Sequence, residues 1–283
     1  MMKKYKVNLH ILEACNFRCF HCFSRFGSSE IMGLEEWKRI VDNCMESQVV
    51  SEFNIAGGEP LLYKDLIGLA KYIREKGAKV SIITNGFLMN EEWIQKYGQL
   101  FSTIGFSVDS VNDETNQKIG RCINTSSVIS ASRVTKLCEL IRKYAPSCKI
   151  KINTVVTTKN KDEQLSDFID TIKPDRWKIL KMKPFVYGAF SNIGLQVSAA
   201  EFDEFVRQNK IANEKTQIVV EPDMKASYIL IGPNGWLLDN AANEITPVEI
   251  CDCRKEKFDD GLKKLTLDEK RYRSRYTLQS NDI

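Results

Sequence analysis

The chain has 283 residues, of which 43% are hydrophobic and 28% charged, as in an ordinary globular protein. The net charge of +4 gives no overall case for nucleic-acid binding, although local lysines can still bind small anions. No stretch approaches the roughly 20 apolar residues that span a bilayer, and no secretory signal precedes the cysteines. We therefore expect a cytoplasmic protein without a membrane or nucleic-acid partner, whose nine cysteines stay free or bind metal.

Short runs rich in Val, Ile, Phe and Thr alternate with longer helical stretches along most of the chain. Such runs are typical of buried parallel strands. The predicted strands are Lys6–Leu12, Glu52–Ala56, Lys79–Asn85, Thr103–Asp109, Lys149–Thr157 and Arg176–Phe185. The predicted helices are Leu34–Ser47, Tyr63–Lys76, Glu91–Phe101, Ser127–Tyr144, Lys161–Ile172 and Ala199–Ile211.

Repeated strand–helix units predict an α/β protein with a parallel sheet and right-handed crossovers. An open, partial (β/α)6 barrel and a doubly wound sheet both fit this pattern, and both place sites at the carboxyl ends of the strands. We expect residues 1–211 to form the barrel core and residues 212–283 an extension that covers its mouth. Short strands are predicted in that extension near 217–220, 227–231 and 236–238, and a loose tail after residue 251 is the alternative.

A C-x3-C-x2-C motif follows the first predicted strand and consists of Cys15, Cys19 and Cys22. Thiolates are the preferred ligands of iron–sulfur clusters. Three closely spaced cysteines would hold three irons of a cubane and leave the fourth iron open to an external molecule. Two alternatives are a zinc site completed by His21, Cys251 or Cys253, and three unrelated buried thiols.

The second predicted strand is followed by Gly57-Gly58-Glu59-Pro60. With the cysteine motif, this turn resembles the radical S-adenosylmethionine superfamily, whose cluster motif is C-x3-C-x-φ-C. His21 occupies the φ position, which is usually aromatic. The resemblance implies a [4Fe–4S] cluster whose open iron binds S-adenosylmethionine. It implies that His21, Gly57, Gly58 and Glu59 belong to the cofactor site, where glycine lets the backbone approach the methionine amine.

A closer resemblance, over nearly the whole chain, is to the viperin family. Its segments are Cys15–Phe23, Phe53–Leu62, Ser81–Gly86, Ser107–Ser110, Ile119–Arg121, Lys151–Asn153, Arg176–Lys178 and Met224–Tyr228. The resemblance implies an enzyme that converts a nucleoside triphosphate (CTP, UTP or GTP, pyrimidine favoured) into its 3′-deoxy-3′,4′-didehydro analogue through a 5′-deoxyadenosyl radical. Such products are antiviral chain terminators. We also expect a monomer that takes electrons from a donor such as flavodoxin or ferredoxin, although no residue of the sequence identifies either property.

Two other functional classes stay open from the sequence. One is another radical enzyme of the same superfamily that acts on a peptide or a small metabolite. The other is a non-enzymatic zinc-binding or nucleotide-binding module.

The viperin resemblance implies further contacts to S-adenosylmethionine from Asn85, Ser107, Arg121 and Asn153. Asn153 also stands out because it interrupts an apolar strand, and a buried amide needs hydrogen-bond partners. Arg121 has a simpler alternative as a solvated charge, and Asn85 has one as a turn residue.

The same resemblance implies that the triphosphate is bound by Lys151, Lys178, Lys225, Arg273 and Arg275. Lys151 and Lys178 interrupt apolar runs, where an unpaired ammonium is costly and an anionic ligand would offset that cost. The alternative is that both side chains extend to the surface.

Two positions depart from the viperin pattern. Glu52 stands where the vertebrate proteins have a lysine that contacts phosphate, and Ala56 replaces a serine. Cys251 and Cys253 would fit a second cluster, but we favour incidental thiols. The remaining cysteines are predicted to be packing residues, namely Cys44, Cys122, Cys138 and Cys148.

Overall fold

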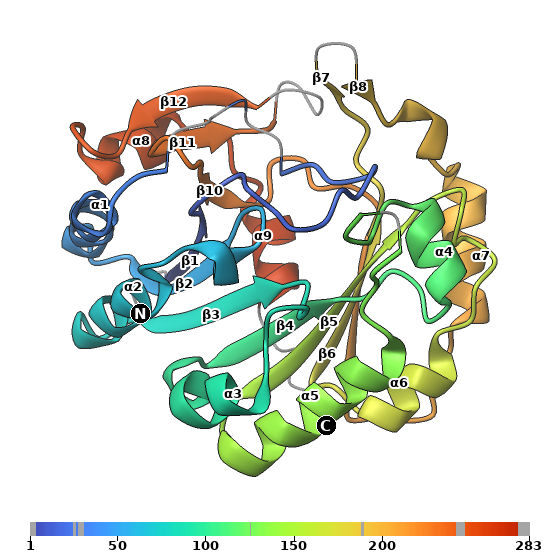
Figure 1. Cartoon of the computed structure of the whole chain (residues 1–283). Helices are drawn as coiled ribbons and strands as arrows, with labels where there is room; N and C mark the ends of the chain where they lie inside the picture. Colours follow the sequence, from blue (N-terminus) through green and yellow to red (C-terminus); the bar gives the residue numbers. More distant parts are fainter. Residues whose placement is uncertain are drawn as a thin grey trace, which may run out of the picture.

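A curved parallel sheet organises the computed structural model, which describes residues 4–24, 27, 31–124, 126–187, 190–241 and 247–276. Within these residues the sheet has ten strands in the order β12-β11-β10-β1-β2-β3-β4-β5-β6-β9 (Figure 1). Strands β1 to β6 run parallel in chain order. They are β1 (Tyr5–His10), β2 (Val50–Ala56), β3 (Lys79–Thr84), β4 (Thr103–Ser107), β5 (Lys149–Val156) and β6 (Arg176–Lys181).

Helices follow the strands and lie along the outer side of the curve (Figure 1). They are α1 (Leu34–Glu46), α2 (Leu66–Glu75), α3 (Glu91–Tyr97), α4 (Asp113–Lys118), α5 (Ala131–Tyr144), α6 (Ser166–Ile172) and α7 (Ala199–Gln208). Single 3-10 turns are η1 (Pro60–Leu62), η2 (Gly98–Leu100) and η3 (Ile193–Leu195). The layout confirms the predicted partial barrel.

Helix α5 illustrates why these segments fold as they do. Its apolar residues recur every three or four positions, so one face is apolar and packs on the sheet. That face buries Val134, Leu137, Cys138 and Ile141. The Ser130 side chain caps the helix by accepting a hydrogen bond from the Arg133 amide at 3.3 Å. The helix therefore begins later than the sequence pattern predicts.

The C-terminal part of the chain extends the main sheet at both edges. Strand β9 (Gln217–Glu221) pairs in parallel with β6, and β10 (Ile229–Ile231) pairs in parallel with β1. Strands β11 (Trp236–Asp239) and β12 (Val248–Asp252) continue antiparallel. A separate two-stranded ribbon joins β7 (Val186–Tyr187) and β8 (Phe190–Ser191). The extension thus continues the barrel wall, and a division of the chain at residue 211 stays a prediction.

Helices α8 (Phe258–Lys264) and α9 (Glu269–Tyr276) were not expected. The alternative of a loose tail is therefore not seen up to residue 276, and residues 277–283 lie outside the described part. Helix α9 crosses the amino ends of β1 and β6. The Tyr272 hydroxyl accepts from the Lys6 amide at 2.6 Å and donates to the Lys6 carbonyl at 3.1 Å. The Arg176 guanidinium donates to the Arg275 carbonyl at 3.1 Å. These contacts close the barrel at the end opposite to its mouth.

The inner face of the barrel is polar. Side chains alternate across a strand, so Lys6, Asn8 and His10 of β1 share one face. The Asn54 amide donates to Asn8 Oδ1 at 3.1 Å, and Ser81 Oγ donates to Asn54 Oδ1 at 3.0 Å. A buried polar ladder costs free energy unless its members are paired, and here they pair across three adjacent strands. The interior is consequently able to receive a polar ligand.

In the described part of the chain, no helix is both long and apolar enough to cross a membrane. All nine cysteines lie in this part, and none forms a disulfide. The four that were predicted to be packing residues are buried.

Candidate active site

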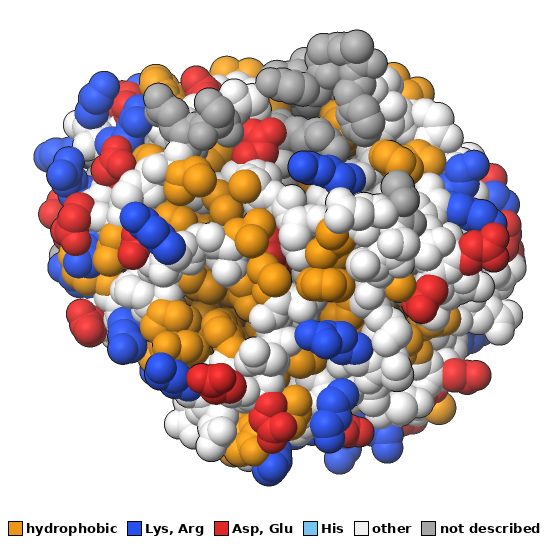
Figure 2. Space-filling model, viewed as in Figure 1, with side chains coloured by type: hydrophobic (Ala, Val, Ile, Leu, Met, Phe, Trp, Pro, Cys, Tyr) orange, Lys and Arg blue, Asp and Glu red, His pale blue; other side chains and the backbone are white. Residues whose placement is uncertain are grey.

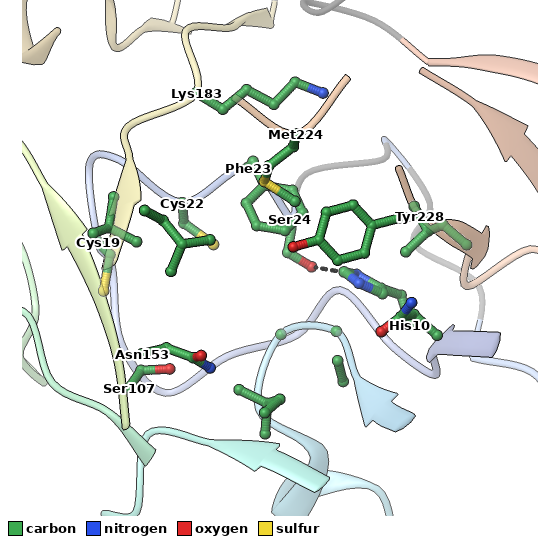
Figure 3. Close-up of a pocket in the computed structure, with 18 of the residues that line it drawn as sticks. His10, Cys19, Cys22, Phe23, Ser24, Ser107, Asn153, Lys183, Met224 and Tyr228 are labelled. Atoms are coloured by element: carbon green, nitrogen blue, oxygen red, sulfur yellow. Dashed lines mark hydrogen bonds between the residues drawn. The ribbon is translucent and has the colours of Figure 1, made fainter. Parts of the chain in front are cut away.

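One pocket of about 360 Å³ runs from the barrel mouth into its interior. Pockets for small ligands commonly start at about 300 Å³, so this one is large enough. In Figure 3 the sulfurs of Cys19 and Cys22 lie on one side, with Tyr228 and His10 on the other. Figure 2 shows hydrophobic side chains gathered toward the middle of this face of the molecule, with most of the charged side chains nearer its edge. The pocket lining itself combines apolar residues such as Phe23 and Phe185 with polar and charged ones such as Asn153 and Lys178.

The three motif cysteines all line this pocket and are partly buried. Burial raises the pKa of the Cys15 thiol to about 11 and raises that of Cys19 as well, and each thiol also feels the charge of Cys22. Bound iron would reverse this effect, because a coordinating thiol is deprotonated. Clustered thiols at a cavity wall fit an iron–sulfur cluster.

A single metal ion fits the arrangement less well. Among the described residues, no group of three or more His, Cys, Asp or Glu side chains is placed to hold one ion. Zinc would need four such ligands around one centre. In a cubane cluster each cysteine instead binds its own iron, so the sulfurs need not converge on one point.

Two glycines bring the turn after β2 against the backbone that leads to Cys15. Gly57 has φ +130°, a conformation that favours glycine. A Cβ atom on Gly58 would lie 2.0 Å from the Ala14 carbonyl oxygen. The Gly58 amide donates to the Leu12 carbonyl at 2.7 Å, and the Glu59 amide donates to the Ala14 carbonyl at 2.9 Å. The glycines thus position the cysteine loop, besides the contact to S-adenosylmethionine that the resemblance implies.

Glu59 lies behind the pocket wall and does not line it. The side chain is fully buried and accepts hydrogen bonds from Thr84 Oγ1 at 2.6 Å, the Asn85 amide at 2.8 Å and the Leu61 amide at 3.1 Å. Burial raises its pKa, and these hydrogen bonds oppose the shift. The structure gives Glu59 a clear structural role, which is to tie the glycine turn to the end of β3.

Asn85, Ser107 and Asn153 line the pocket, as expected of cofactor contacts. Asn85 donates to Asn16 Oδ1 at 2.7 Å beside Cys15. Ser107 and Asn153 lie together at one side of the cavity (Figure 3) and are register partners on β4 and β5. The Oδ1 atom of Asn153 is buried without a hydrogen-bond partner among the described residues. Because such an atom costs free energy, it marks a position where a ligand would donate.

Asp109 connects two of the predicted cofactor residues. Its Oδ2 atom accepts from Arg121 Nη1 at 2.9 Å and lies 3.1 Å from His21 Nε2. Burial raises the pKa of Asp109, but Arg121 and His21 outweigh burial and lower it to about 2. Arg121 also donates to the Ser107 carbonyl, so its guanidinium is buried and fixed and the alternative of a solvated charge is wrong. The Asp109 cluster holds the cysteine loop against the end of β4.

Lysines gather in the pocket toward the amino ends of the strands. Lys6, Lys151 and Lys178 all line it. Lys6 pairs with Glu52 at 2.6 Å, and Lys178 pairs with Glu221. Lys151 has no hydrogen-bond or ion-pair partner among the described residues, and its pKa is lowered well below the usual value by burial and then by Lys178 and Lys6. Three lysine side chains around one cavity favour a multiply charged anion, whose charge would stabilise the protonated form of Lys151 against this lowering of its pKa.

The other predicted phosphate ligands lie elsewhere. Lys225 is exposed and lines a smaller neighbouring cavity of about 230 Å³. Arg273 is about half exposed and pairs with Glu269 at 3.4 Å, so the structure does not bring it to the pocket. Arg275 is buried behind the pocket, where its Nε lies 3.5 Å from Glu221. Arg273 and Arg275 differ in exposure because residues two positions apart on a helix point to different sides of it.

Several residues that line the pocket or lie directly behind its wall were missed from the sequence. His10 contacts Ser24 Oγ at 3.2 Å, and burial lowers the His10 pKa to about 3. Tyr228 and Glu221 form a buried cluster with Lys178. Alternation along β1 would have shown that His10 shares a face with Lys6. No sequence signal reveals that β9 brings Glu221 beside β6.

Comparison with known proteins decides the family. The profile of the Radical SAM superfamily matches residues 9–172. An S-adenosylmethionine-dependent nucleotide dehydratase of Selenomonas ruminantium is 39% identical over 274 residues, which cover 96% of this chain and 98% of the relative. The chain belongs to the S-adenosylmethionine-dependent nucleotide dehydratases of the radical SAM superfamily. A relative of the same name from Psychrobacter lutiphocae is 35% identical over 254 residues, which cover 84% of this chain and 83% of the relative.

Solved structures support the fold. SuiB of Streptococcus suis, bound to S-adenosylmethionine, superposes with a TM-score of 0.68 at 18% identity, covering 96% of this chain and 68% of SuiB. The peptide-bound structure of anSMEcpe gives 0.70 at 14% identity, covering 97% of this chain and 85% of that one. The predictions of a radical SAM enzyme, of its partial barrel and of its two cofactors, a [4Fe–4S] cluster and S-adenosylmethionine, are confirmed at the level of the family.

Cys251 and Cys253 lie away from the pocket and are buried near Cys44 of α1. Burial raises the pKa of Cys44, and the two other thiols add to that shift. In the described part of the chain these thiols form no metal-binding group. Their assignment as incidental thiols stays a prediction.

Proposed function

We propose that this enzyme converts a nucleoside triphosphate, with a pyrimidine base favoured, into its 3′-deoxy-3′,4′-didehydro analogue. The observation that carries the proposal is the basic end of the pocket, where Lys151 lies without a partner among the described residues beside Lys6 and Lys178. An unpaired ammonium in an enclosed site is costly, and phosphate groups would offset that cost.

The two ends of the pocket suggest how the substrate lies. Cys15, Cys19 and Cys22 would hold the cluster at the mouth, and the lysines would hold the triphosphate in the interior. The ribose would then lie between these two ends of the pocket. When bound, the cluster and S-adenosylmethionine would supply a 5′-deoxyadenosyl radical able to take the 4′ hydrogen of a nucleotide that the chain holds in place.

The chain itself contributes orientation and exclusion of water, because the cofactors carry the difficult chemistry. Asn85 and the glycine turn fix the loop that bears Cys15. The unpaired Oδ1 of Asn153 would accept a hydrogen bond from S-adenosylmethionine. A substrate held at both ends loses little further entropy on reaction, and this is how positioning raises the rate.

Several finer features belong to the same proposal. We place the enzyme in the reducing cytoplasm, as a monomer that receives electrons from a flavodoxin-like or ferredoxin-like donor. The nine free cysteines favour a reducing compartment.

The test is anaerobic reconstitution of the cluster, followed by S-adenosylmethionine, a reductant and one of CTP, UTP, GTP or ATP. We expect at least one triphosphate to stimulate 5′-deoxyadenosine formation and to lose the elements of water, measured by chromatography with mass spectrometry. The variant Lys151→Met should lose roughly ten- to a hundredfold in kcat/KM, as expected for a lost charged hydrogen bond.

Lys136→Met is the matched control, because Lys136 is exposed on α5 and 66% of its side chain is accessible. It should behave as the unaltered enzyme does. If no triphosphate is dehydrated, or if K151M is fully active, the proposed substrate is wrong. Full activity of K151M toward a peptide would point to the peptide-modifying alternative.

A further inference from the structure

Glu221 on β9 is the centre of a buried charge cluster behind the pocket wall. The side chain is 2% exposed and forms an ion pair with Lys178 of β6. Its Oε2 atom accepts a hydrogen bond from the Tyr228 hydroxyl at 2.6 Å, and Arg275 Nε of α9 lies 3.5 Å from Oε1. Lys178 and Tyr228 line the pocket, whereas Glu221 and Arg275 do not. Glu221 therefore acts on the pocket through its neighbours.

The groups around Lys178 are mostly cationic. Arg275 approaches from α9 and Arg176 lies on β6 itself, and both disfavour the charged ammonium. Lys151 faces it from β5. Glu221 is the one carboxylate in contact with Lys178 in the described part of the chain. Without that carboxylate, a buried ammonium among like charges would tend to release its proton.

Tyr228 fixes the direction of the ammonium. Lys178 donates a hydrogen bond to the Tyr228 hydroxyl and lies 4.9 Å from the ring centroid. Arg275 lies 4.7 Å from the same centroid. Because the Tyr228 hydroxyl donates to Glu221, its lone pairs are turned toward Lys178. One carboxylate thus orders both side chains.

We propose that Glu221 is a positioning residue that keeps the Lys178 ammonium charged and held at the pocket wall, where it binds the phosphate groups of the nucleotide. This inference rests on the proposed function and adds to it a residue that does not touch the substrate. The opposite role is that Glu221 competes with phosphate for Lys178, and the two roles predict opposite effects.

The pKa of Lys178 supports a test by pH. Burial lowers this pKa to about 8, and Glu221 opposes the shift. The ammonium is protonated below that pH and loses its charge above it, so triphosphate affinity should fall as the pH rises through 8. Removal of the Glu221 charge lowers the pKa further and moves this loss toward pH 7. The last ionisation of a phosphate group lies near about pH 6, so it does not interfere above pH 7.

The experiment measures the Kd of CTP, with UTP and GTP in parallel, by anaerobic calorimetry from pH 7 to 9 with the cluster and S-adenosylmethionine in place. If Glu221→Gln lowers the Lys178 pKa by about one unit, we expect binding to weaken roughly threefold at pH 7.5 and about tenfold at pH 9, where the charged fraction falls by the full factor of one pKa unit. KM should rise similarly while kcat changes little. Glu139→Gln on the exposed face of α5 is the control and should match the unaltered enzyme.

A double-mutant cycle assigns the effect to Lys178. In the Lys178→Met background, Glu221→Gln should cause no further loss of affinity, since the ammonium is already absent. If Glu221→Gln does not fold, Glu221→Asp retains the charge on a shorter side chain. That variant should bind CTP more weakly than the unaltered enzyme. Its CTP affinity should also begin to fall at a lower pH as the pH is raised.

Two outcomes contradict the inference. If Glu221→Gln binds CTP equally well or better across the pH range, Glu221 is a bystander or a competitor. Loss of affinity of the same size in the Lys178→Met background shows that Glu221 does not act through Lys178. An unaltered enzyme that binds none of the triphosphates overturns the proposed function itself, and the role of Glu221 falls with it.

Discussion

Gly58 shows how much the site depends on a single missing side chain. A Cβ there would meet the Ala14 carbonyl oxygen at 2.0 Å and that of Glu13 at 2.4 Å, and backbone atoms move less readily than side chains. The sequence motif identifies this turn, but only the structure shows that it packs against the cysteine loop.

We expect Gly58→Ala to displace the backbone before Cys15 and to lower stability by about 1–3 kcal/mol, the usual cost of an overpacked site. Iron content after reconstitution and affinity for S-adenosylmethionine should both fall, measured by iron assay and calorimetry. Gly194→Ala is the control, because no atom lies within 4 Å of its added Cβ. Normal iron loading in G58A would contradict this role of the glycine.

At the scale of elements, α9 is the least expected feature. Its sequence is polar and short, and its hydrophobic pattern gives little sign of a helix. It forms where Tyr272 can pack against Tyr5, with ring centroids 5.5 Å apart, and bond the Lys6 backbone. In this way it carries Arg275 to Glu221. Tertiary packing thus overrides a weak local propensity.

We predict that Tyr272→Ala releases α9 and weakens triphosphate binding, because Arg275 and the Lys178 cluster lose their support. Affinity for S-adenosylmethionine should stay within about twofold, since its predicted contacts are distant and separate sites behave additively. Tyr272→Phe keeps the ring and should cost only about 1 kcal/mol of stability for the lost hydroxyl bonds. Calorimetry with both ligands and urea unfolding would measure these effects. Equal losses for both ligands would argue against a separate role for α9.

At the scale of the whole molecule, we expect the fold to be independent of the cluster. One hydrophobic core runs along the sheet and the helices, with the cysteine loop at its edge: Trp37, Phe53, Phe106 and Trp177 are fully buried in that core. A core of this size stabilises a domain without metal, unlike a zinc finger, which unfolds when its metal is removed.

Chelation of the iron under reducing conditions should therefore abolish cleavage of S-adenosylmethionine and leave the far-ultraviolet circular dichroism spectrum almost unchanged. The thermal midpoint should move by no more than a few degrees, which corresponds to about 1 kcal/mol in a domain of this size. The Cys15→Ser, Cys19→Ser, Cys22→Ser variant should behave in the same way. Cooperative unfolding on iron loss would show that the cluster is part of the core.

The sequence by itself determined the strands β1 to β6, most of the helices between them, the cysteine motif and the family, but it missed the short helix α4 between β4 and β5. These features are local, because periodicity and short motifs depend on residues that are close together in the sequence. The order of the parallel strands follows from the preference for right-handed crossovers. Lys151 and Lys178 also stood out because each interrupts an apolar strand.

Only the tertiary structure decided which charges meet. Glu221, Tyr228 and Arg275 surround Lys178, although they come from distant parts of the chain. Arg273 and Arg275 differ by two positions, yet one is exposed and the other is buried at this cluster. Charge pairing depends on distance in space, which spacing along the sequence does not define. The substrate end of the pocket was therefore less predictable than its cluster end.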